Sequence, residues 1–244
     1  MYSGKECCLT QTKRKPDKLN PEKVAYWYLR LNGFLQIEDF YVHPPARGGA
    51  RTDADILAVR FPYRAERLYD DDNDIMEDDN KRLSLSPSLI DVIIAEVKTG
   101  QCGLNGPWTD PSRENVHRVL AAIGCLPIDQ IKKAAEAIYR NGSFIYRPQT
   151  DRQTNEFNVR IRLLSIGEYI NNEQRDKDPE VLQLVWSEIL GFIFERMRKF
   201  RNQKKQTEHW DRVGIRLKQD AAKPGSNKED VVGAQLLAIK QYTK

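Results

Sequence analysis

The sequence predicts an α/β fold, and three observations lead to this prediction. Segments with the apolar spacing of helices and segments rich in β-branched and aromatic residues follow one another in the order α, β, β, β, α, β, β. One of the latter, 89–99 (LIDVIIAEVKT), is apolar on both faces, which is typical of a strand at the centre of a sheet. The chain of 244 residues, of which 40% are hydrophobic, is long enough to bury a large core.

A helix followed by three strands is expected in the first hundred residues. Asn20-Pro21 has the residue types of an N-cap and a first helical position, and Asn32-Gly33 is a typical stop, so the helix is expected at 21–32. β-Branched and aromatic residues then predict strands at 34–42, 54–61 and 89–99. The chain therefore opens in the order helix, strand, strand, strand.

Two helices and a hairpin are expected next. Helical patterns occupy 112–124 and 127–140, and Asn141-Gly142 ends the second of them. The segments 143–148 and 158–165 have the alternation of a further pair of strands. This part of the chain therefore adds strands to the predicted sheet.

The C-terminal part is expected to be entirely helical. Asp178-Pro179 predicts the start of the longest helix, at about 179–202, and Ser226-Asn-Lys-Glu229 has the spacing of a capping box that starts the last one. The expected organisation is a polar tail at 1–19, a core at 20–167 and a helical extension at 168–244.

Composition favours a soluble protein of a reducing compartment. Mean hydropathy is −0.66, and no apolar run reaches the length of a membrane span. The first twenty residues are polar and basic, without the apolar centre of a secretory signal. The four cysteines lack the spacing of zinc ligands. We therefore expect a cytoplasmic protein with no membrane partner and no disulfide framework.

Charge is unevenly distributed along the chain. The net charge is +4, yet residues 66–79 hold eight acids and one base, so the remainder is strongly basic. This block belongs to an acidic insertion at 66–82, which we interpret as a solvated loop or, alternatively, as a mimic of phosphates that covers a basic groove. Six bases at 196–205 are interpreted as a solvated helix end.

Two charged residues extend the half-buried face of the central strand. The two-residue period places Glu96 and Lys98 on the same face as the apolar Val92 and Ile94. Charges on such a face cost several kcal/mol unless they pair or hold a metal. The two alternatives at this point are therefore a structural ion-pair network and a functional site.

Asp55 is the expected neighbour of these charges. If 54–61 and 89–99 pair as antiparallel strands with Phe61 near Ile90, Asp55 lies opposite Glu96. Two facing carboxylates destabilise each other, and a hard divalent cation with oxygen ligands relieves their repulsion. This register therefore predicts a metal site at the start of one strand and the end of the other.

The ordered set of charged motifs resembles the PD-(D/E)XK nuclease superfamily. Its members share a restriction-endonuclease-like core in which a mixed central sheet, flanked by helices, follows the order αβββαβ, and the resemblance covers about 20–165. The Pro-Asp dipeptide of the family is absent, and Thr52-Asp53-Ala54-Asp55 stands in its place. Asp53 therefore competes with Asp55 for the role of metal ligand. Asp55 is preferred because strand residues follow it directly. The opening helix is similar to that of small Holliday-junction-resolvase-like members, and the matching motifs are Glu22-Lys-Val-Ala25-Tyr-Trp-Tyr28-Leu29 with Gly33-Phe34, Asp55-Ile-Leu-Ala58 and Ala95-Glu96-Val97-Lys98-Thr99.

The resemblance implies a role for each residue of the set. Asp55 and Glu96 would ligate Mg²⁺ or Mn²⁺ with the Val97 carbonyl as a third oxygen, and Lys98 would orient the attacking water and stabilise charge. Glu22 would contact the metal through water or hold a second ion. A glutamate in the first turn of a helix is also favoured by the helix dipole alone, so both interpretations of Glu22 stay open.

Other residues are candidates for nucleic-acid contacts. Arg160 and Arg162 also fit the exposed face of an alternating strand. Trp108 is a candidate for base stacking or for the core. The candidates for phosphate contacts are Arg51, Lys132, Lys133, Arg160 and Arg162.

The function that the sequence predicts is divalent-metal-dependent hydrolysis of phosphodiester bonds, in DNA rather than RNA because the resemblance lies with DNA-acting members. A homodimer is compatible with a site that cuts one strand at a time. One alternative is a catalytically inactive nucleic-acid-binding or assembly subunit of the same fold. Another is a protein-interaction module that docks through the acidic loop and the basic helix end.

Overall fold

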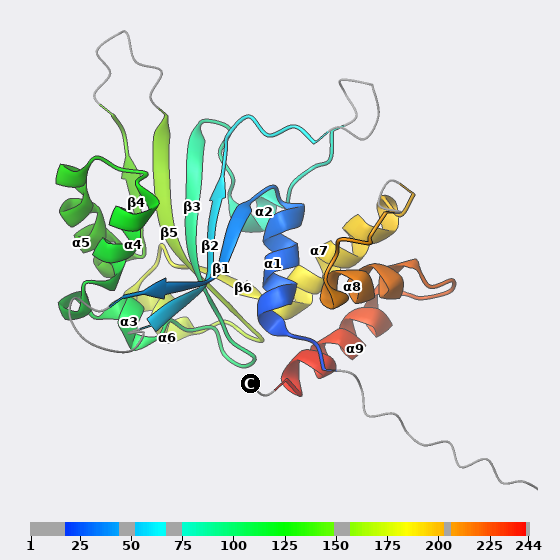
Figure 1. Ribbon diagram of the computed structural model, residues 1–244. Helices are drawn as coiled ribbons and strands as arrows, with labels where there is room; N and C mark the ends of the chain where they lie inside the picture. Colours follow the sequence, from blue (N-terminus) through cyan, green and yellow to red (C-terminus); the bar gives the residue numbers. More distant parts are fainter. Residues whose placement is uncertain (1–17, 44–51, 67–74, 149–156, 203–205, 243–244) are drawn as a thin grey trace, which may run out of the picture.

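A mixed six-stranded sheet forms the centre of the molecule, with helices on both of its faces (Figure 1). The structure is a computed structural model that describes residues 18–43, 52–66, 75–148, 157–202 and 206–242. The strands are β1 (Leu35–Val42), β2 (Thr52–Arg60), β3 (Leu89–Val97), β4 (Ser143–Tyr146), β5 (Asn158–Gly167) and β6 (Leu182–Val185).

The sheet has β3 at its centre, as predicted from its apolar sequence. Its order is β1-β2-β3-β5-β4, and β6 pairs with the second half of β5. β3 pairs antiparallel with β2 and parallel with β5. Ile56 lies opposite Ala95 and Arg60 opposite Asp91, which confirms the register expected from Phe61 and Ile90. The predicted hairpin of β4 and β5 is also confirmed.

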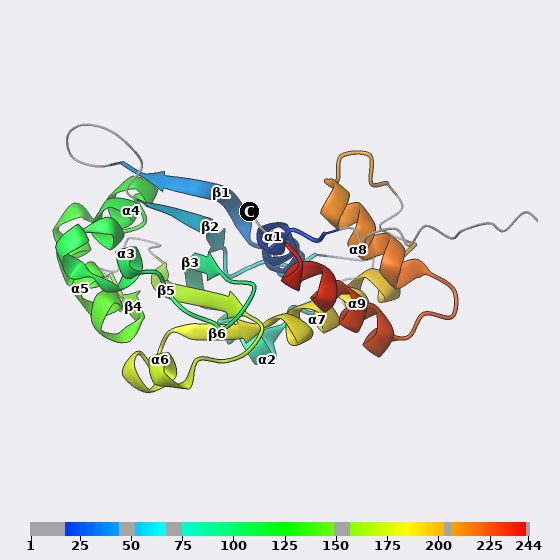
Figure 2. The ribbon, with the colours of Figure 1, turned by 90° about the horizontal axis from the view of Figure 1, so that it is seen from below.

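Two helical layers enclose the sheet. α1 and α7 lie on one face together with the C-terminal α8 and α9, and α3, α4 and α5 cover the other face (Figure 2). Within the described residues, 3₁₀ turns lie at Pro111–Arg113 and Ile128–Gln130. The helices are α1 (Pro21–Leu31), α2 (Asn80–Leu83), α3 (Gly106–Thr109), α4 (Asn115–Ile123), α5 (Ile131–Asn141), α6 (Asn172–Lys177), α7 (Trp186–Lys199), α8 (Arg212–Ala222) and α9 (Lys228–Lys240).

Each face of the sheet buries its own hydrophobic cluster. The first cluster includes Ile56 and Ala95 from the strands and extends from Leu19, before α1, to Ile239 in α9. The second joins Ile94 and Leu57 to α3, α4 and α5. The C-terminal helices therefore complete the same core that α1 begins.

The first helix has the boundaries that its sequence predicts. The Asn20 side chain accepts a hydrogen bond from the Lys23 N–H at 3.2 Å, and Pro21 occupies the first turn, where its missing N–H costs nothing. Gly33 follows the helix with φ of 79°, a conformation that glycine adopts without strain. α1 therefore begins and ends through local chemistry.

The predicted long helix at 179–202 is wrong at its beginning. α7 starts at Trp186, and Leu182–Val185 form β6, which pairs with Leu164–Gly167 of β5. β4 covers only the first half of β5, so the second half offers backbone groups to this short apolar segment. Tertiary hydrogen bonding therefore overrides the helical spacing here.

The acidic insertion is partly buried, rather than fully solvated, where the structure describes it. Met76 is buried, and Asp78 lies between Arg60 and Arg64 at 2.7 and 2.5 Å. Asp79 is buried and accepts a hydrogen bond from the Tyr28 hydroxyl at 2.9 Å. Burial, with the Asp79 charge, raises the pKa of Tyr28. Residues 67–74 of the insertion lie outside the described residues.

The basic segment at 196–205 also departs from expectation at its first residue. Arg196 is buried rather than solvated, and its guanidinium donates hydrogen bonds to the carbonyls of Leu31 and Glu77. Burial lowers the pKa of this arginine. Arg198 and Lys199 are exposed, in agreement with a solvated helix end, and 203–205 lie outside the described residues.

None of the helices within the described ranges is long and apolar enough to cross a membrane.

Cys102 and Cys125 are free thiols, and burial raises the pKa of Cys102 to about 11. Cys7 and Cys8 lie outside the described residues.

The contact between α1 and α8 yields a prediction about stability. A Cβ atom at Gly214 of α8 would lie 2.1 Å from the Trp27 ring, whereas one at Gly233 of α9 would meet nothing within 4 Å. We expect Gly214→Ala to lower the free energy of unfolding by about 1–3 kcal/mol and Gly233→Ala to raise it by about 0.5–1 kcal/mol. Urea unfolding of both variants checks this, and equal effects would contradict the packing described.

Candidate active site

Asp55, Glu96 and Lys98 meet where β2 begins and β3 ends. The register brings this about, because one step beyond the Ile56–Ala95 pair places Asp55 opposite Glu96. Asp55 and Glu96 are buried, with 8% and 3% of their surface exposed. The structure therefore brings together the three residues that the sequence singled out on these strands.

Asp55 takes over the pairing of β2 with β3 through its side chain. The antiparallel ladder between the two strands ends at Ile56 and Ala95. Beyond it, the Asp55 Oδ2 accepts a hydrogen bond from the Val97 N–H at 2.7 Å. On β1, the neighbour of β2 on its other side, Asp39 has φ of 50° between the pairs Glu38–Ile56 and Phe40–Ala54. The backbone of β1 is therefore irregular beside Asp55. The carboxylate thus lies against the backbone that links Glu96 to Lys98.

Glu96 is the centre of a buried polar group. The Lys98 Nζ donates to its Oε1 at 2.5 Å, and the Asn105 side-chain amide donates to the same oxygen. Its Oε2 accepts from the Trp108 Nε1 at 3.0 Å. A charged residue and two neutral donors therefore compensate the cost of burying this carboxylate.

Lys98 connects this group to solvent. Its Nζ also donates to the Asn105 Oδ1 at 2.8 Å, and 31% of its side chain is exposed. Its backbone is held on both sides, by its own N–H to the Ile166 carbonyl at 2.8 Å and by the Trp186 Nε1 to its carbonyl at 2.9 Å. The ammonium is thus fixed in place at the edge of the buried carboxylates.

The sequence did not indicate Asn105 as a site residue, and it did not predict the contact of Trp108 with Glu96. Trp108 was a candidate for base stacking or for the core, and it is a core residue, 1% exposed, whose indole N–H contacts Glu96. Asn105 lies in the loop between β3 and α3, where no motif marks it. Their proximity to Glu96 in sequence was the only available signal.

Glu22 and Asp53 are the two other acidic candidates, and both are half-buried. Glu22 is half-buried in the first turn of α1, a helix that packs on the sheet face opposite to Trp108. Asp53 is half-buried in β2, opposite Tyr41. The hydrogen bond to Val97 belongs to Asp55, which supports the preference for Asp55 over Asp53.

The prediction that Arg162 lies on the exposed face of a strand is wrong, because its side chain is buried. Both Arg160 and Arg162 donate to the Asp91 carboxylate, at 2.8 and 2.5 Å, at the start of β3. Arg162 is 4% exposed, and its burial lowers its pKa although the Asp91 charge acts in the opposite direction. The pair lies at the end of β3 away from Glu96 and binds Asp91 in a partly buried ion cluster.

Three candidates for phosphate contacts remain, two on α5 and one outside the described residues. Lys132 and Lys133 are exposed on α5. Arg51 lies outside the described residues.

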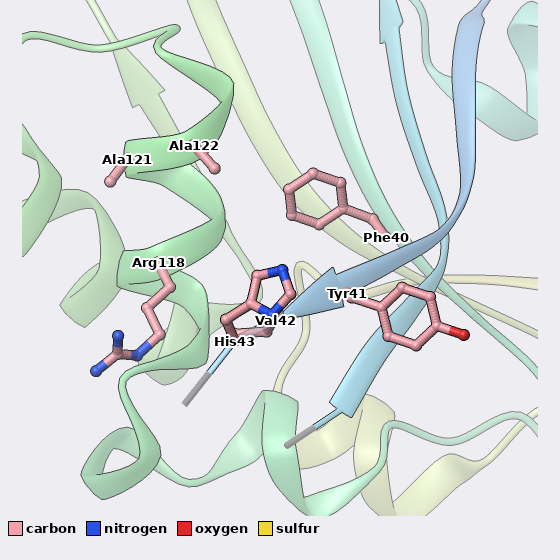
Figure 3. Close-up of a pocket in the computed structure, with 7 residues that line it drawn as sticks. All are labelled: Phe40, Tyr41, Val42, His43, Arg118, Ala121 and Ala122. Carbon is pink, nitrogen blue, oxygen red and sulfur yellow. The ribbon is translucent and has the colours of Figure 1, made fainter. Parts of the chain in front are cut away.

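A cavity of about 570 Å³ lies between the end of β1 and α4 (Figure 3). Phe40, one of its lining residues, pairs with Ala54, the neighbour of Asp55. Figure 3 shows His43 and Arg118 on opposite sides of this space, while the Tyr41 ring points away from it. Asp55, Glu96 and Lys98 do not line the cavity.

Comparison with known proteins gives no relatives. No family model, no curated protein and no solved structure matches the chain.

The hydrogen bond from Trp108 to Glu96 gives a prediction about stability. Trp108→Phe keeps most of the ring but removes one donor from a buried carboxylate, so we expect the free energy of unfolding to fall by about 2 kcal/mol. Trp210→Phe is the matched control, because Trp210 is only half-buried and contacts Trp27 through its ring. Its expected loss is below about 1 kcal/mol. Equal losses in urea unfolding would show that the bond to Glu96 contributes little.

Proposed function

We propose that this protein is a divalent-metal-dependent nuclease that hydrolyses phosphodiester bonds, with DNA as its substrate. One observation carries the proposal: two buried carboxylates from adjacent strands, Asp55 and Glu96, lie around one peptide unit with a fixed ammonium beside them. The resemblance of the motifs to PD-(D/E)XK nucleases, whose core has a mixed sheet with this helix and strand order, supports it further. DNA is preferred because that resemblance lies with DNA-acting members.

The donor chemistry fits Mg²⁺ or Mn²⁺. Both cations prefer oxygen ligands, and the Asp55 and Glu96 carboxylates with the Val97 carbonyl are the ligands that we propose. The described part of the chain has no group of three or more His, Cys, Asp or Glu side chains that could hold a metal, so water would complete the coordination. When bound, the cation would neutralise charge on the phosphate and lower the pKa of a water molecule.

The protein residues have separate tasks in this proposal. Lys98 donates hydrogen bonds to Glu96 and Asn105, so its ammonium has fewer accessible rotamers than that of an exposed lysine. There it would orient the attacking water and stabilise the charge that develops on the phosphate. Asn105 and Trp108 are positioning residues, because they hold Glu96 rather than touch substrate. Glu22 stays a proposed water-mediated metal contact.

Cleavage assays on linear, supercoiled and branched DNA test the proposal. With Mg²⁺ or Mn²⁺ the wild type should cut DNA, and with EDTA it should not. Lys98→Ala and Asp55→Asn should each lower the rate by at least about a hundredfold. Asp55→Asn keeps an oxygen that can accept from the Val97 N–H, so its stability should stay close to that of the wild type.

The controls separate loss of chemistry from loss of structure. Arg140→Ala, which changes an exposed cation on α5, should cut at the wild-type rate. Wild-type protein that is folded yet cuts neither DNA nor an RNA control with either metal would refute the nuclease proposal. Undiminished cutting by folded Asp55→Asn would place the chemistry elsewhere.

A second candidate is a catalytically inactive nucleic-acid-binding or assembly subunit. It is favoured by the three donors that already compensate Glu96, because such a carboxylate has no need of a cation.

Thermal unfolding with and without metal distinguishes the two candidates. Mg²⁺ at a hundred times its dissociation constant should stabilise a true metal site by about 2.7 kcal/mol. We therefore expect Mg²⁺ or Mn²⁺ to raise the melting temperature of the wild type but not that of Asp55→Asn. An unchanged wild-type melting temperature at millimolar metal, together with retained DNA binding, would favour the inactive subunit.

A further inference from the structure

A basic groove lies on the C-terminal helices, in the part of the chain to which the sequence motifs assign no role. Its volume is about 680 Å³, and it lies between α8 and the residues that precede α1. Four cationic side chains and one carboxylate give its lining a formal net charge of +3. The charged residues are Lys18, Arg212, Arg216, Lys223 and Asp220.

The single acid of the groove is already compensated by its neighbours. Asp220 Oδ1 lies 2.9 Å from the Lys223 Nζ, and its Oδ2 lies 3.7 Å from the Arg216 Nε. The Gln235 side chain of α9 donates to the same Oδ2 at 3.2 Å. The Asp220 carboxylate thus holds two cations at the groove, and the net charge of the groove lining stays positive.

Contacts with α1 and α9 hold the backbone of the groove in place. Asp211, the N-cap of α8, accepts a hydrogen bond from the Trp27 Nε1 at 3.1 Å, and Gly214 packs against the same ring. Before α1, the Leu19 N–H donates to the Ala238 carbonyl at 3.2 Å, which anchors the chain beside Lys18. The backbone that carries the cations is therefore ordered before any ligand arrives, which lowers the entropic cost of binding.

The position of the groove relates it to the candidate active site. Lys18 precedes α1, and Glu22 lies in the first turn of that helix. Figure 2 shows α8 and α9 on one side of α1 and the strands β2 and β3 on the other. A long polyanion that crosses the beginning of α1 could thus reach both the groove and the end of β3.

We propose that this groove binds the phosphodiester backbone of the DNA duplex, at a distance from the phosphate that is cut. The proposal deepens the proposed function, on which it rests for the choice of DNA. Four cationic side chains against one carboxylate in the lining suit phosphates along a strand, and such contacts position a duplex without reading its sequence. Their contribution to affinity depends strongly on salt, because binding releases counterions.

Fluorescence anisotropy of a labelled DNA duplex, measured in EDTA over a series of salt concentrations, tests the groove apart from cleavage. The double variant Arg212→Ala/Lys223→Ala should bind at least about tenfold more weakly, with a salt slope smaller by about two. The matched control is Arg140→Ala/Lys81→Ala, which removes the same charges from exposed positions on α5 and α2. The control should bind within about twofold of the wild type.

A third variant keeps the test independent of folding defects. Asp220→Asn removes the acid of the groove but keeps a similar shape, so DNA should bind about two- to fivefold more tightly. An RNA duplex of equal length serves as a second arm, and stronger binding to RNA would overturn the choice of DNA.

The outcomes for the groove and for the nuclease are distinguishable. An unchanged salt slope in Arg212→Ala/Lys223→Ala, or a wild type that does not bind the duplex at low salt, would overturn the groove. If the salt slope is unchanged in the double variant but the wild type cleaves DNA, the proposed nuclease function stays intact. Conversely, a groove-dependent salt slope in a protein that never cuts would support the groove and refute the nuclease.

Discussion

The candidate site depends on the hydrogen bond that the Val97 N–H donates to the Asp55 carboxylate. β2 and β3 cease to pair through their backbones at Ile56 and Ala95, so this side chain continues the ladder. It gives the buried Val97 N–H an acceptor that it would otherwise lack. It also fixes the Asp55 carboxylate beside the strand that carries Glu96. A single interaction thereby supports both the end of the sheet and the geometry of the proposed metal ligands.

The electrostatics around Glu96 explain how the fold tolerates this arrangement. A buried carboxylate without partners would cost several kcal/mol, and Lys98, Asn105 and Trp108 compensate that cost. The same contacts serve either candidate function, since a structural network and a preorganised catalytic group both need satisfied charges. The difference lies in Lys98, which is partly exposed and therefore accessible to a substrate. The C-terminal helices place additional positive charge beyond α1, where a polyanionic substrate would extend.

Some of this architecture follows from the sequence alone, and the reasons are local. The caps at Asn20 and Gly33 predict α1, and the two-residue period of the strands predicts the pairing that brings Asp55 to Glu96. β6 could not be predicted, because its short sequence Leu-Gln-Leu-Val before a helix looks like the first turn of that helix until the unpaired half of β5 is known. The buried Asp79 and Arg196 depend on partners distant in sequence, and Asn105 has no pattern that separates it from an ordinary loop residue.

The most direct test of the central claim, a divalent cation held between Asp55 and Glu96, is an anomalous diffraction measurement on crystals of the wild-type protein grown with Mn²⁺. The account predicts an anomalous peak within coordination distance of both carboxylates, and its loss in crystals of Asp55→Asn. A well-ordered site without such a peak, in which Glu96 keeps its bonds to Lys98, Asn105 and Trp108, would contradict the account. That result would identify the cluster as part of the scaffold.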